Sequence, residues 1–206
     1  QATVRRDGSS NFGPNNLYAI FPSASVGWNF TNENFLANRP QWFSSGKLRA
    51  SWGKNGNESI GQFKYTTTMA SGNNYPFGNP GVVNTGAKPN GFANADIRWE
   101  ESTQTDIGLD LAFFSSALTF SVDWYKKNTT GMLMDIPVPA YSGDSAPTGN
   151  VGIMDNSGWE FDFRYRFSLG DAHFNIGANA TYLNNLLVEL GNENGWQNYD
   201  SHKIGT

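Results

Sequence analysis

Charged side chains recur at every second position between residues 159 and 167, and aromatic residues occupy the positions between them. Glu160 and Asp162 are followed by Arg164 and Arg166. Because a β-strand sends successive side chains to opposite faces, this spacing places the carboxylates and the guanidinium groups on one face. Such groups can form ion pairs, hold water or bind a polar solute. The opposite face would be wholly aromatic, which is typical of a wall with water on one side and lipid on the other.

Charges elsewhere in the chain follow the same rule, because they also alternate with apolar residues. We predict that they line the interior of a β-barrel and pair along or across the strands. A hydrated ladder that keeps the lumen wet is the simpler hypothesis, and a track that guides a substrate is the alternative. The candidate lumen-facing residues are Arg49, Asp106, Asp110, Asp123, Glu160, Asp162, Arg164 and Arg166.

No combination of residues in the sequence indicates bond-breaking chemistry. Glu100 and Glu101 would point to opposite faces of a strand, so they cannot flank one glycosidic bond. His173 and His202 are isolated, whereas a zinc site requires clustered ligands. Residues 53–56 lack the spacing of a phosphate-binding loop, and the sequence has no cysteine to act as a nucleophile or metal ligand. We therefore predict that the protein is not an enzyme and needs no cofactor.

Four aromatic residues lie in stretches that lack an alternating pattern, at Tyr75, Phe77, Tyr141 and Trp196. Aromatic rings on loops can stack on the sugar rings of a glycan, or they can pack one loop against another. We expect packing to be their main role, with contact to a substrate as the alternative.

The elements that must position these side chains are β-strands, because six segments show the two-residue period. Several of them reach the ~9–11 residues that a strand needs to cross a bilayer at a tilt. No helical period of useful length accompanies them. The six segments are residues 23–30, 47–53, 102–113, 118–125, 159–167 and 174–182.

The connections between the predicted strands differ in length at the two ends. Ser115-Ser116 and Gly170-Asp171 predict tight turns, and a glycine at the first position suits a type II′ turn. Long connections rich in glycine, asparagine and proline are predicted over about 54–98 and 126–158, with a short extra hairpin around 63–67. Tight turns at one end and long loops at the other are typical of outer-membrane barrels, where the turns face the periplasm.

The predicted turns also determine which residues pair across the strands. We predict that Phe113 lies opposite Leu118, Leu111 opposite Phe120 and Leu109 opposite Val122, and likewise Phe167 opposite Phe174 and Phe163 opposite Ala178. In each pair an apolar residue meets an apolar residue, and a slip of one residue would reverse the faces. Phe161, Phe163, Leu111 and Phe120 should then point away from the barrel axis.

Composition agrees with an all-β fold and excludes several functions. Hydrophobic residues make up 38% and charged residues 16% of 206 residues, and the formal net charge is -4. A negative charge argues against nucleic-acid binding, which needs a basic surface. We predict an antiparallel transmembrane β-barrel segment with short periplasmic turns and long extracellular loops. The chain opens and closes abruptly, so we expect an interior piece of a longer protein, with plug and remaining strands elsewhere.

Two alternatives share the predicted strands. A soluble β-sandwich that binds carbohydrate would bury its aromatic face against a second sheet and would show no systematic difference in loop length. A passive porin-type barrel would have the same wall but no plug domain.

Short motifs in a fixed order resemble the SusC/RagA-like TonB-linked outer-membrane receptors. They extend over nearly the whole chain, and their order and spacing together are specific. Two positions depart from the family pattern, since Gly46 stands where an apolar residue is common and Gly131 where Asp or Asn is common. The motifs are 6–13, 15–16, 21–23, 27–28, 47–53, 56–57, 99–100, 103, 107–110, 125–129, 137, 139, 150–152 and 156–160.

This resemblance implies a large barrel in the outer membrane of a Gram-negative cell, closed by a plug and energised by TonB. It further implies a SusD-like surface lipoprotein as partner, contact with outer-membrane lipid, and import of a bulky nutrient. Oligosaccharides and peptides are the substrates of such receptors, and an oligosaccharide is the first expectation here.

Overall fold

The computed structural model describes residues 1–206 except 137, 140, 142–145, 191–195, 200–201 and 206. Strands dominate, with short 3₁₀ turns at η1 (Phe30–Asn32) and η2 (Asn34–Leu36), and no helix among the described residues is long and apolar enough to span a bilayer. The main strands are β1 (Ala2–Gly8), β2 (Tyr18–Trp28), β3 (Phe43–Asn57), β8 (Glu100–Phe113), β9 (Leu118–Asp135), β10 (Thr148–Leu169) and β11 (Ala172–Glu189). The short strands are β4 (Met69–Ser71), β5 (Tyr75–Phe77), β6 (Val82–Asn84), β7 (Ala87–Pro89), β12 (Trp196–Tyr199) and β13 (His202–Gly205).

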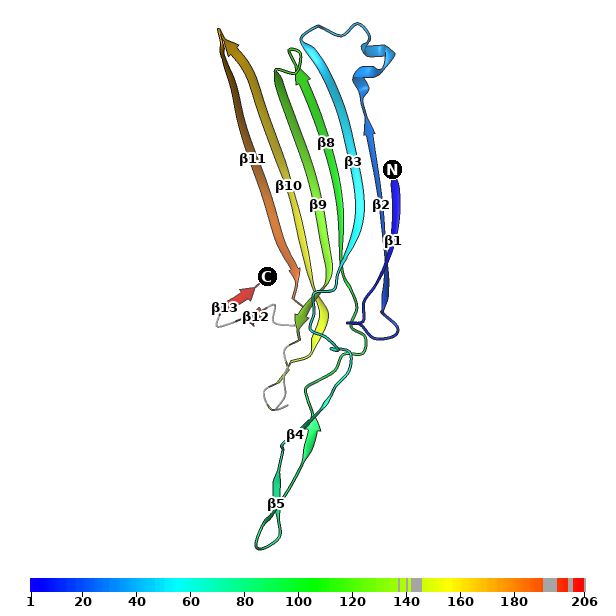
Figure 1. The fold of residues 1–206 in the computed structure, drawn as a ribbon, viewed down its shortest axis with the longest axis vertical. Helices are drawn as coiled ribbons and strands as arrows, with labels where there is room; N and C mark the ends of the chain where they lie inside the picture. Colours follow the sequence, from blue (N-terminus) through cyan, green and yellow to red (C-terminus); the bar gives the residue numbers. More distant parts are fainter. Residues whose placement is uncertain (137, 140, 142–145, 191–195, 200–201, 206) are drawn as a thin grey trace.

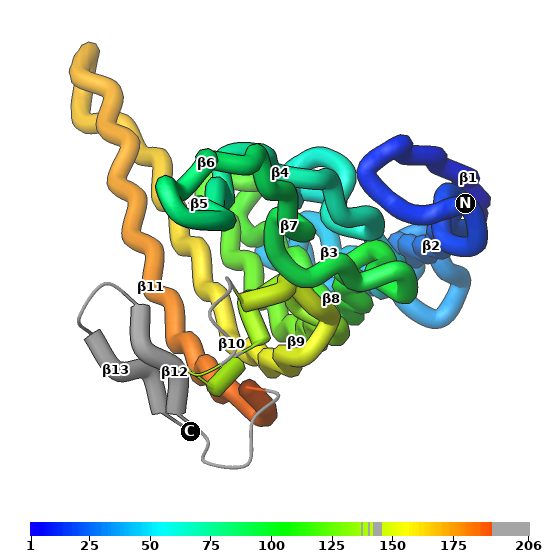
Figure 2. The backbone as a smooth tube through the Cα atoms, turned by 90° about the horizontal axis from the view of Figure 1, so that it is seen from below, coloured from blue at the N-terminus to red at the C-terminus, as the bar shows by residue number. Residues whose placement is uncertain are grey.

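One tall antiparallel sheet contains the seven main strands, in the order β1-β2-β3-β8-β9-β10-β11 (Figure 1). Each strand pairs with the next main strand of the chain, so the sheet is a simple meander. Figure 2, seen from below, shows the strands following one another from β1 and β2 at one side to β10 and β11 at the other. The predicted all-β, antiparallel fold is confirmed.

Two tight turns lie at one end of the sheet, where they were predicted. Ser115 and Ser116 both have positive φ, and the Ala117 amide donates to the Phe114 carbonyl at 3.0 Å. This geometry matches a type I′ turn, whose twist fits a hairpin. In the other turn only Gly170 has positive φ, at 59°, as a type II′ turn requires. We call this end of the sheet the turn end.

The predicted pairings across both hairpins are confirmed. Phe113 faces Leu118, Leu111 faces Phe120 and Leu109 faces Val122 between β8 and β9. Phe167 faces Phe174 and Phe163 faces Ala178 between β10 and β11. The position of each tight turn, together with the parity of the alternating pattern, was therefore sufficient to predict this register.

Strands extend further toward the opposite end, the loop end, than the sequence predicted. Residues 126–135 belong to β9 and residues 148–158 to β10, although we expected a loop over 126–158. The reason is that residues of one kind follow one another here, polar at 126–130 and apolar at 132–134, so the two-residue alternation ends before the strand does. Gly131 has φ 62° and stands at a β-bulge between β9 and β10. Asn and Asp tolerate this left-handed conformation better than other residues, which explains the family preference at this position.

The extra hairpin also lies later in the sequence than predicted. Phe63 to Thr67 form no strand, and Phe63 has φ 56°. Instead β4 pairs with β7 and β5 pairs with β6, which builds a slender arm over residues 69–89. The arm projects from the loop end well beyond the sheet (Figure 1).

A small buried core lies at the loop end, and several of the family motifs converge on it. Phe12, Phe21, Ile97 and Trp99 are almost fully buried, with the Trp99 ring 5.1 Å from Phe12 and 5.6 Å from Phe21. A Cβ atom at Gly56 would overlap the Phe21 ring, so glycine is needed there. The motif residues therefore tie the β1–β2 and β7–β8 connections to the end of the sheet.

The connection between β2 and β3 is longer than the tight turns beside it. Residues 29–42 contain η1 and η2 and lie at the turn end (Figure 1). The ring of Phe30 covers Gly46, where a Cβ atom would overlap it. This contact explains why glycine stands at position 46, where the family commonly has an apolar residue, because the Phe30 ring fills the place of that side chain.

Candidate functional site on the polar face of the sheet

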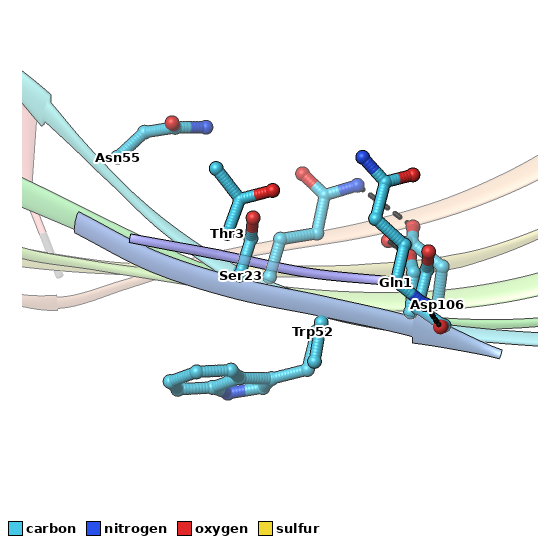
Figure 3. A pocket seen from close by; sticks show the side chains of 11 residues that line it. Gln1, Thr3, Ser23, Trp52, Asn55 and Asp106 are labelled. Carbon is cyan, nitrogen blue, oxygen red and sulfur yellow. Dashed lines mark hydrogen bonds between the residues drawn. The ribbon is translucent and has the colours of Figure 1, made fainter. Parts of the chain in front are cut away.

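The two faces of the sheet differ in chemistry from edge to edge. Directly paired residues of neighbouring strands share a face, and successive rows of paired residues alternate between the two faces. Two such successive rows are Lys47–Asp110–Ser121–Asp162–Asn179 and Leu48–Leu109–Val122–Phe161–Ala180. The first row belongs to the face that we call the polar face, and the second to the apolar face. In Figure 3 Thr3, Ser23 and Asn55 stand on one side of the sheet and Trp52 on the other.

The apolar face is exposed in the described part of the chain, although it consists of large hydrophobic residues. Phe163 retains 41% of its accessible surface at the centre of the face. Aromatic residues gather toward the two ends of this face. Trp124, Trp159 and Tyr182 form a row toward the loop end, and Phe167 stacks on Phe174 at 5.0 Å toward the turn end. Aromatic rows on either side of an apolar band are typical of the lipid-facing surface of a barrel.

Arg49 holds the centre of the polar face by joining three strands. Its Nε and Nη2 donate to the two carboxylate oxygens of Asp110 at 2.7 and 2.9 Å. Its Nη2 also lies 3.0 Å from a carboxylate oxygen of Asp123, and the Ser121 hydroxyl donates to Asp110 at 3.0 Å. One guanidinium group joins two carboxylates, so this centre ties three strands together, keeps a net negative charge and retains partly exposed polar atoms for water or solute.

Gly108 makes this three-strand contact possible. It lies directly between Arg49 of β3 and Asp123 of β9 in the same row. A Cβ atom at Gly108 would overlap the Asp123 carboxylate and would lie 2.7 Å from Cζ of Arg49. The guanidinium group therefore crosses β8 through the space that the missing side chain leaves.

The other predicted charges lie on the same face but form separate groups. Asp106 accepts hydrogen bonds from the Ser51 hydroxyl at 3.0 Å and from the Gln104 amide at 2.7 Å. Asp162 pairs with Arg164 of its own strand at 3.1 Å. Arg166 donates to the Ser116 carbonyl at 3.4 Å.

Glu160 differs from the other charges because it lies directly opposite a like charge. Its cross-strand neighbour is Asp123, which is itself held by Arg49. Like charges at directly opposite positions are destabilising unless a cation lies near them. The Arg49 side chain thus partly compensates two carboxylates of β8 and β9 and lowers the negative potential toward β10.

A hollow of about 380 Å³ opens on the polar face beside the β1 edge of the sheet (Figure 3). Thr3, Ser23, Asn55, Gln104 and Asp106 are among the residues that line it. Hydroxyl and amide groups thus dominate the lining, and Asp106 supplies a carboxylate. Such a surface can exchange hydrogen bonds with water, sugar hydroxyls or peptide groups, but it holds no arrangement for covalent chemistry.

Sequence reasoning named Asp106 but missed the neutral residues that surround it. Ser51 and Gln104 were recognised only as members of alternating segments. Parity alone could have found them, because Ser51 pairs directly with Asp106 and Gln104 lies two residues from Asp106 on the same strand and face. It also missed Lys54 and Glu101, which pair at 2.6 Å beyond the aromatic row near the loop end.

The predicted loop aromatics do not form one cluster in the described residues. Tyr75 and Phe77 lie on the arm with ring centroids 5.0 Å apart, and they retain 64% and 62% of their accessible surface. Tyr141 is 92% exposed in the β9–β10 connection. These three rings are therefore exposed among the described residues, and their role in packing loops or in contacting a substrate stays a prediction. The side chain of Trp196 lies outside the described part of the structure.

A single antiparallel sheet with one exposed aromatic face and one charged face is the wall of a transmembrane β-barrel. Residues 1–204 match the family described as "TonB dependent receptor-like, beta-barrel". The chain therefore belongs to the TonB-dependent receptor family and forms part of its β-barrel in the outer membrane. Members of this family are receptors and transporters, and a soluble sandwich is thereby excluded.

Known relatives support this assignment at the level of sequence and structure. The chain is 42% identical over 189 residues to TonB-dependent receptor P3 of Formosa agariphila, covering 91% of this chain and 18% of the relative. It is 32% identical over 194 residues to TonB-dependent receptor SusC of Bacteroides thetaiotaomicron, covering 91% and 19%. The RagAB peptide importer in its closed-closed state matches with TM-score 0.84 and 26% identity, over 99% of this chain and 22% of that one. The chain thus spans about a fifth of the length of these relatives.

Proposed function

We propose that the chain forms part of the wall of an active importer that carries a bulky nutrient across the outer membrane. Membership in the family of SusC carries this proposal. The hydrated polar face supports it, since a wall around a wide aqueous lumen needs groups that hold water. A passive porin shares such a wall, but its relatives would not be receptors that depend on TonB.

We further propose that the polar face is the lumen side and that all eight predicted charges face it. The exposed aromatic face on the opposite side supports this orientation, because lipid is the solvent that accepts it without cost. In the lumen the ion-paired centre at Arg49 keeps water in place, and the hydroxyl-rich hollow beside it offers hydrogen bonds along the route of a solute.

The proposed substrate is an oligosaccharide, with a peptide as the second candidate. Tyr75 and Phe77 support the first choice, because their exposed rings offer flat apolar surfaces on which the C–H face of a sugar can pack. The name of the RagAB peptide importer is the observation that favours the second. In either case the polar face binds and conducts the substrate and does not cleave it.

Other components of the proposed importer belong to parts beyond this chain. A plug closes the lumen, the TonB complex supplies energy through that plug, and a SusD-like surface lipoprotein covers the loop end. The projecting arm over residues 69–89 supports a partner at this end, because it extends well beyond the sheet.

Uptake by cells that express the full-length receptor tests this proposal. Labelled oligosaccharides and labelled peptides of similar size are offered to cells with and without a functional TonB. We expect accumulation of one oligosaccharide class only when TonB is present, and no cleavage product outside the cell. Uptake that continues without TonB would support a porin instead, and release of cleaved glycan by the purified receptor would contradict transport without catalysis.

The arm provides a second test that separates the two substrate classes. Replacing Tyr75 and Phe77 together by alanine should reduce oligosaccharide uptake several-fold, because both stacking surfaces are lost. Val83→Ala is the matched control, since Val83 lies on the same hairpin and is equally exposed. If peptide uptake falls with the aromatic variant and no oligosaccharide is accumulated, the substrate is a peptide.

A further inference from the structure

The connection over residues 29–42 differs from the other connections at the turn end, because it is folded and carries bulky rings. It contains both 3₁₀ turns of the β2–β3 link. Phe35 retains 70% and Trp42 53% of their accessible surface, although both are large apolar residues. A cluster of exposed apolar rings indicates an interaction surface, and the position of the connection on the sheet indicates what this surface contacts.

The connection folds onto the apolar face and away from the polar one. Gly46 pairs with Leu111, which belongs to the apolar face. The Phe30 ring lies against Gly46 in the space of a missing side chain. Trp28 pairs with Leu48 of the apolar face and contacts both Phe30 and Phe35. The exposed rings of the connection are therefore on the lipid side of the wall.

A continuous series of ring contacts joins the connection to the end of the neighbouring strands. Trp42 stacks on Phe113 at 5.9 Å, and Phe43 lies 5.6 Å from Phe113 and 6.4 Å from Phe30. Trp28 follows at 5.9 Å from Phe30. Phe113 is the last residue of β8, in the row of Leu118 and Tyr165. The connection thus continues the aromatic row at the turn end across β2 and β3.

Polar contacts hold the connection in this fold. The Trp28 indole donates to the Glu33 carboxylate at 2.9 Å, and Arg39 donates to the Thr31 carbonyl at 2.9 Å. The buried Thr31 hydroxyl accepts from the Gly46 amide at 3.3 Å. These bonds fix the rings before any partner arrives, so the surface is preformed.

We propose that the connection 29–42 lies in the headgroup region of the bilayer leaflet at the turn end and anchors the barrel there. Rings with an apolar body and a polar edge favour this region, and Trp42 and Trp28 supply such rings. Arg39 is exposed on the same connection and can meet a lipid phosphate. The proposal depends on the membrane location of the barrel and not on the substrate or on import.

Single labels on the full-length receptor in lipid nanodiscs test this placement. A fluorescent label at Ala37→Cys keeps all the rings of the connection, and a label at Asp171→Cys marks the tight turn at the same end as a control. The other cysteines of the full-length protein, if present, are first replaced. Quenching by lipids with a nitroxide near the headgroup is compared with quenching by a water-soluble nickel chelate.

At position 37 we expect several-fold stronger quenching by the headgroup nitroxide than at position 171, together with a blue-shifted emission. Quenching mainly by the aqueous chelate at both positions would place the connection in water and overturn the proposal. Protection from both quenchers would mean that protein covers the connection, which would also overturn it. A label at Phe35→Cys gives an independent readout, because it replaces the most exposed ring directly.

Discussion

Replacing Phe163 by arginine tests whether the apolar face is immersed in lipid. Phe163 lies midway along β10 between the aromatic positions 159 and 167, four residues from each. At about 3.3 Å per residue and a strand tilt of about 40°, it is ~10 Å from either row along the bilayer normal. That depth corresponds to the centre of an apolar band about 25 Å tall, where arginine costs about 2–4 kcal/mol.

Two control positions make the expected magnitude specific. Trp159→Arg lies at the edge of the band, where the cost should fall to about 0–1 kcal/mol. Asp162→Asn is adjacent in sequence but on the polar face, and losing its partly exposed ion pair with Arg164 should cost at most about 1 kcal/mol. The depth of a position in the bilayer and the face on which it lies thus predict the order of the three losses of unfolding free energy, and not only that each variant is destabilised.

Denaturant unfolding of the full-length receptor in lipid vesicles measures these free energies. We expect Phe163→Arg to lower the free energy of unfolding much more than either control substitution does. Equal costs for Phe163→Arg and Asp162→Asn would refute a lipid-facing aromatic surface. Equal costs for Phe163→Arg and Trp159→Arg would refute the assigned depth even if the face is correct.

Three glycines provide further predictions, each measurable by thermal unfolding of the purified receptor. Gly108→Val should separate Arg49 from Asp123 and destabilise the wall by about 1–3 kcal/mol, with a high-resolution structure showing the guanidinium group displaced. Gly46→Leu should cost a similar ~1–3 kcal/mol by displacing Phe30, and Phe30→Ala in the same protein should recover part of it. Gly131→Asn should be nearly neutral, whereas Gly131→Val should cost about 1–2 kcal/mol because of its positive φ; equal effects would argue against a left-handed conformation there.

Faces and pairings of the central strands could be predicted from the sequence because their alternation is unambiguous and a tight turn sets the register of each hairpin. Every pair predicted for the β8–β9 and β10–β11 hairpins is present. The strand ends could not be predicted, since polar residues such as Lys126 and Lys127 continue β9 on both faces beyond the apolar band. The arm was placed too early because the aromatic spacing at Phe63 and Tyr65 imitated a strand, while the actual strands begin at Met69.

The charges of the candidate site could be assigned to a face, but their contacts could not. Parity showed that Arg49, Asp110 and Asp123 share a face, and no pattern indicated that one guanidinium group reaches two other strands. That contact depends on the missing side chain of Gly108, which appears in the sequence only as one polar-face position among many. The fold of residues 29–42 was also not predicted, because its rings follow no regular period.

The alignment of Arg49, Gly108 and Asp123 has a consequence for how the wall assembles. Alternation alone tolerates a slide of two residues between neighbouring strands, because every side chain then returns to its own face. After such a slide, Arg49 would stand opposite Asp106 or Asp110, and a side chain would block its path across β8. The contact among these three residues therefore favours the native register over the registers shifted by two residues while the strands pair.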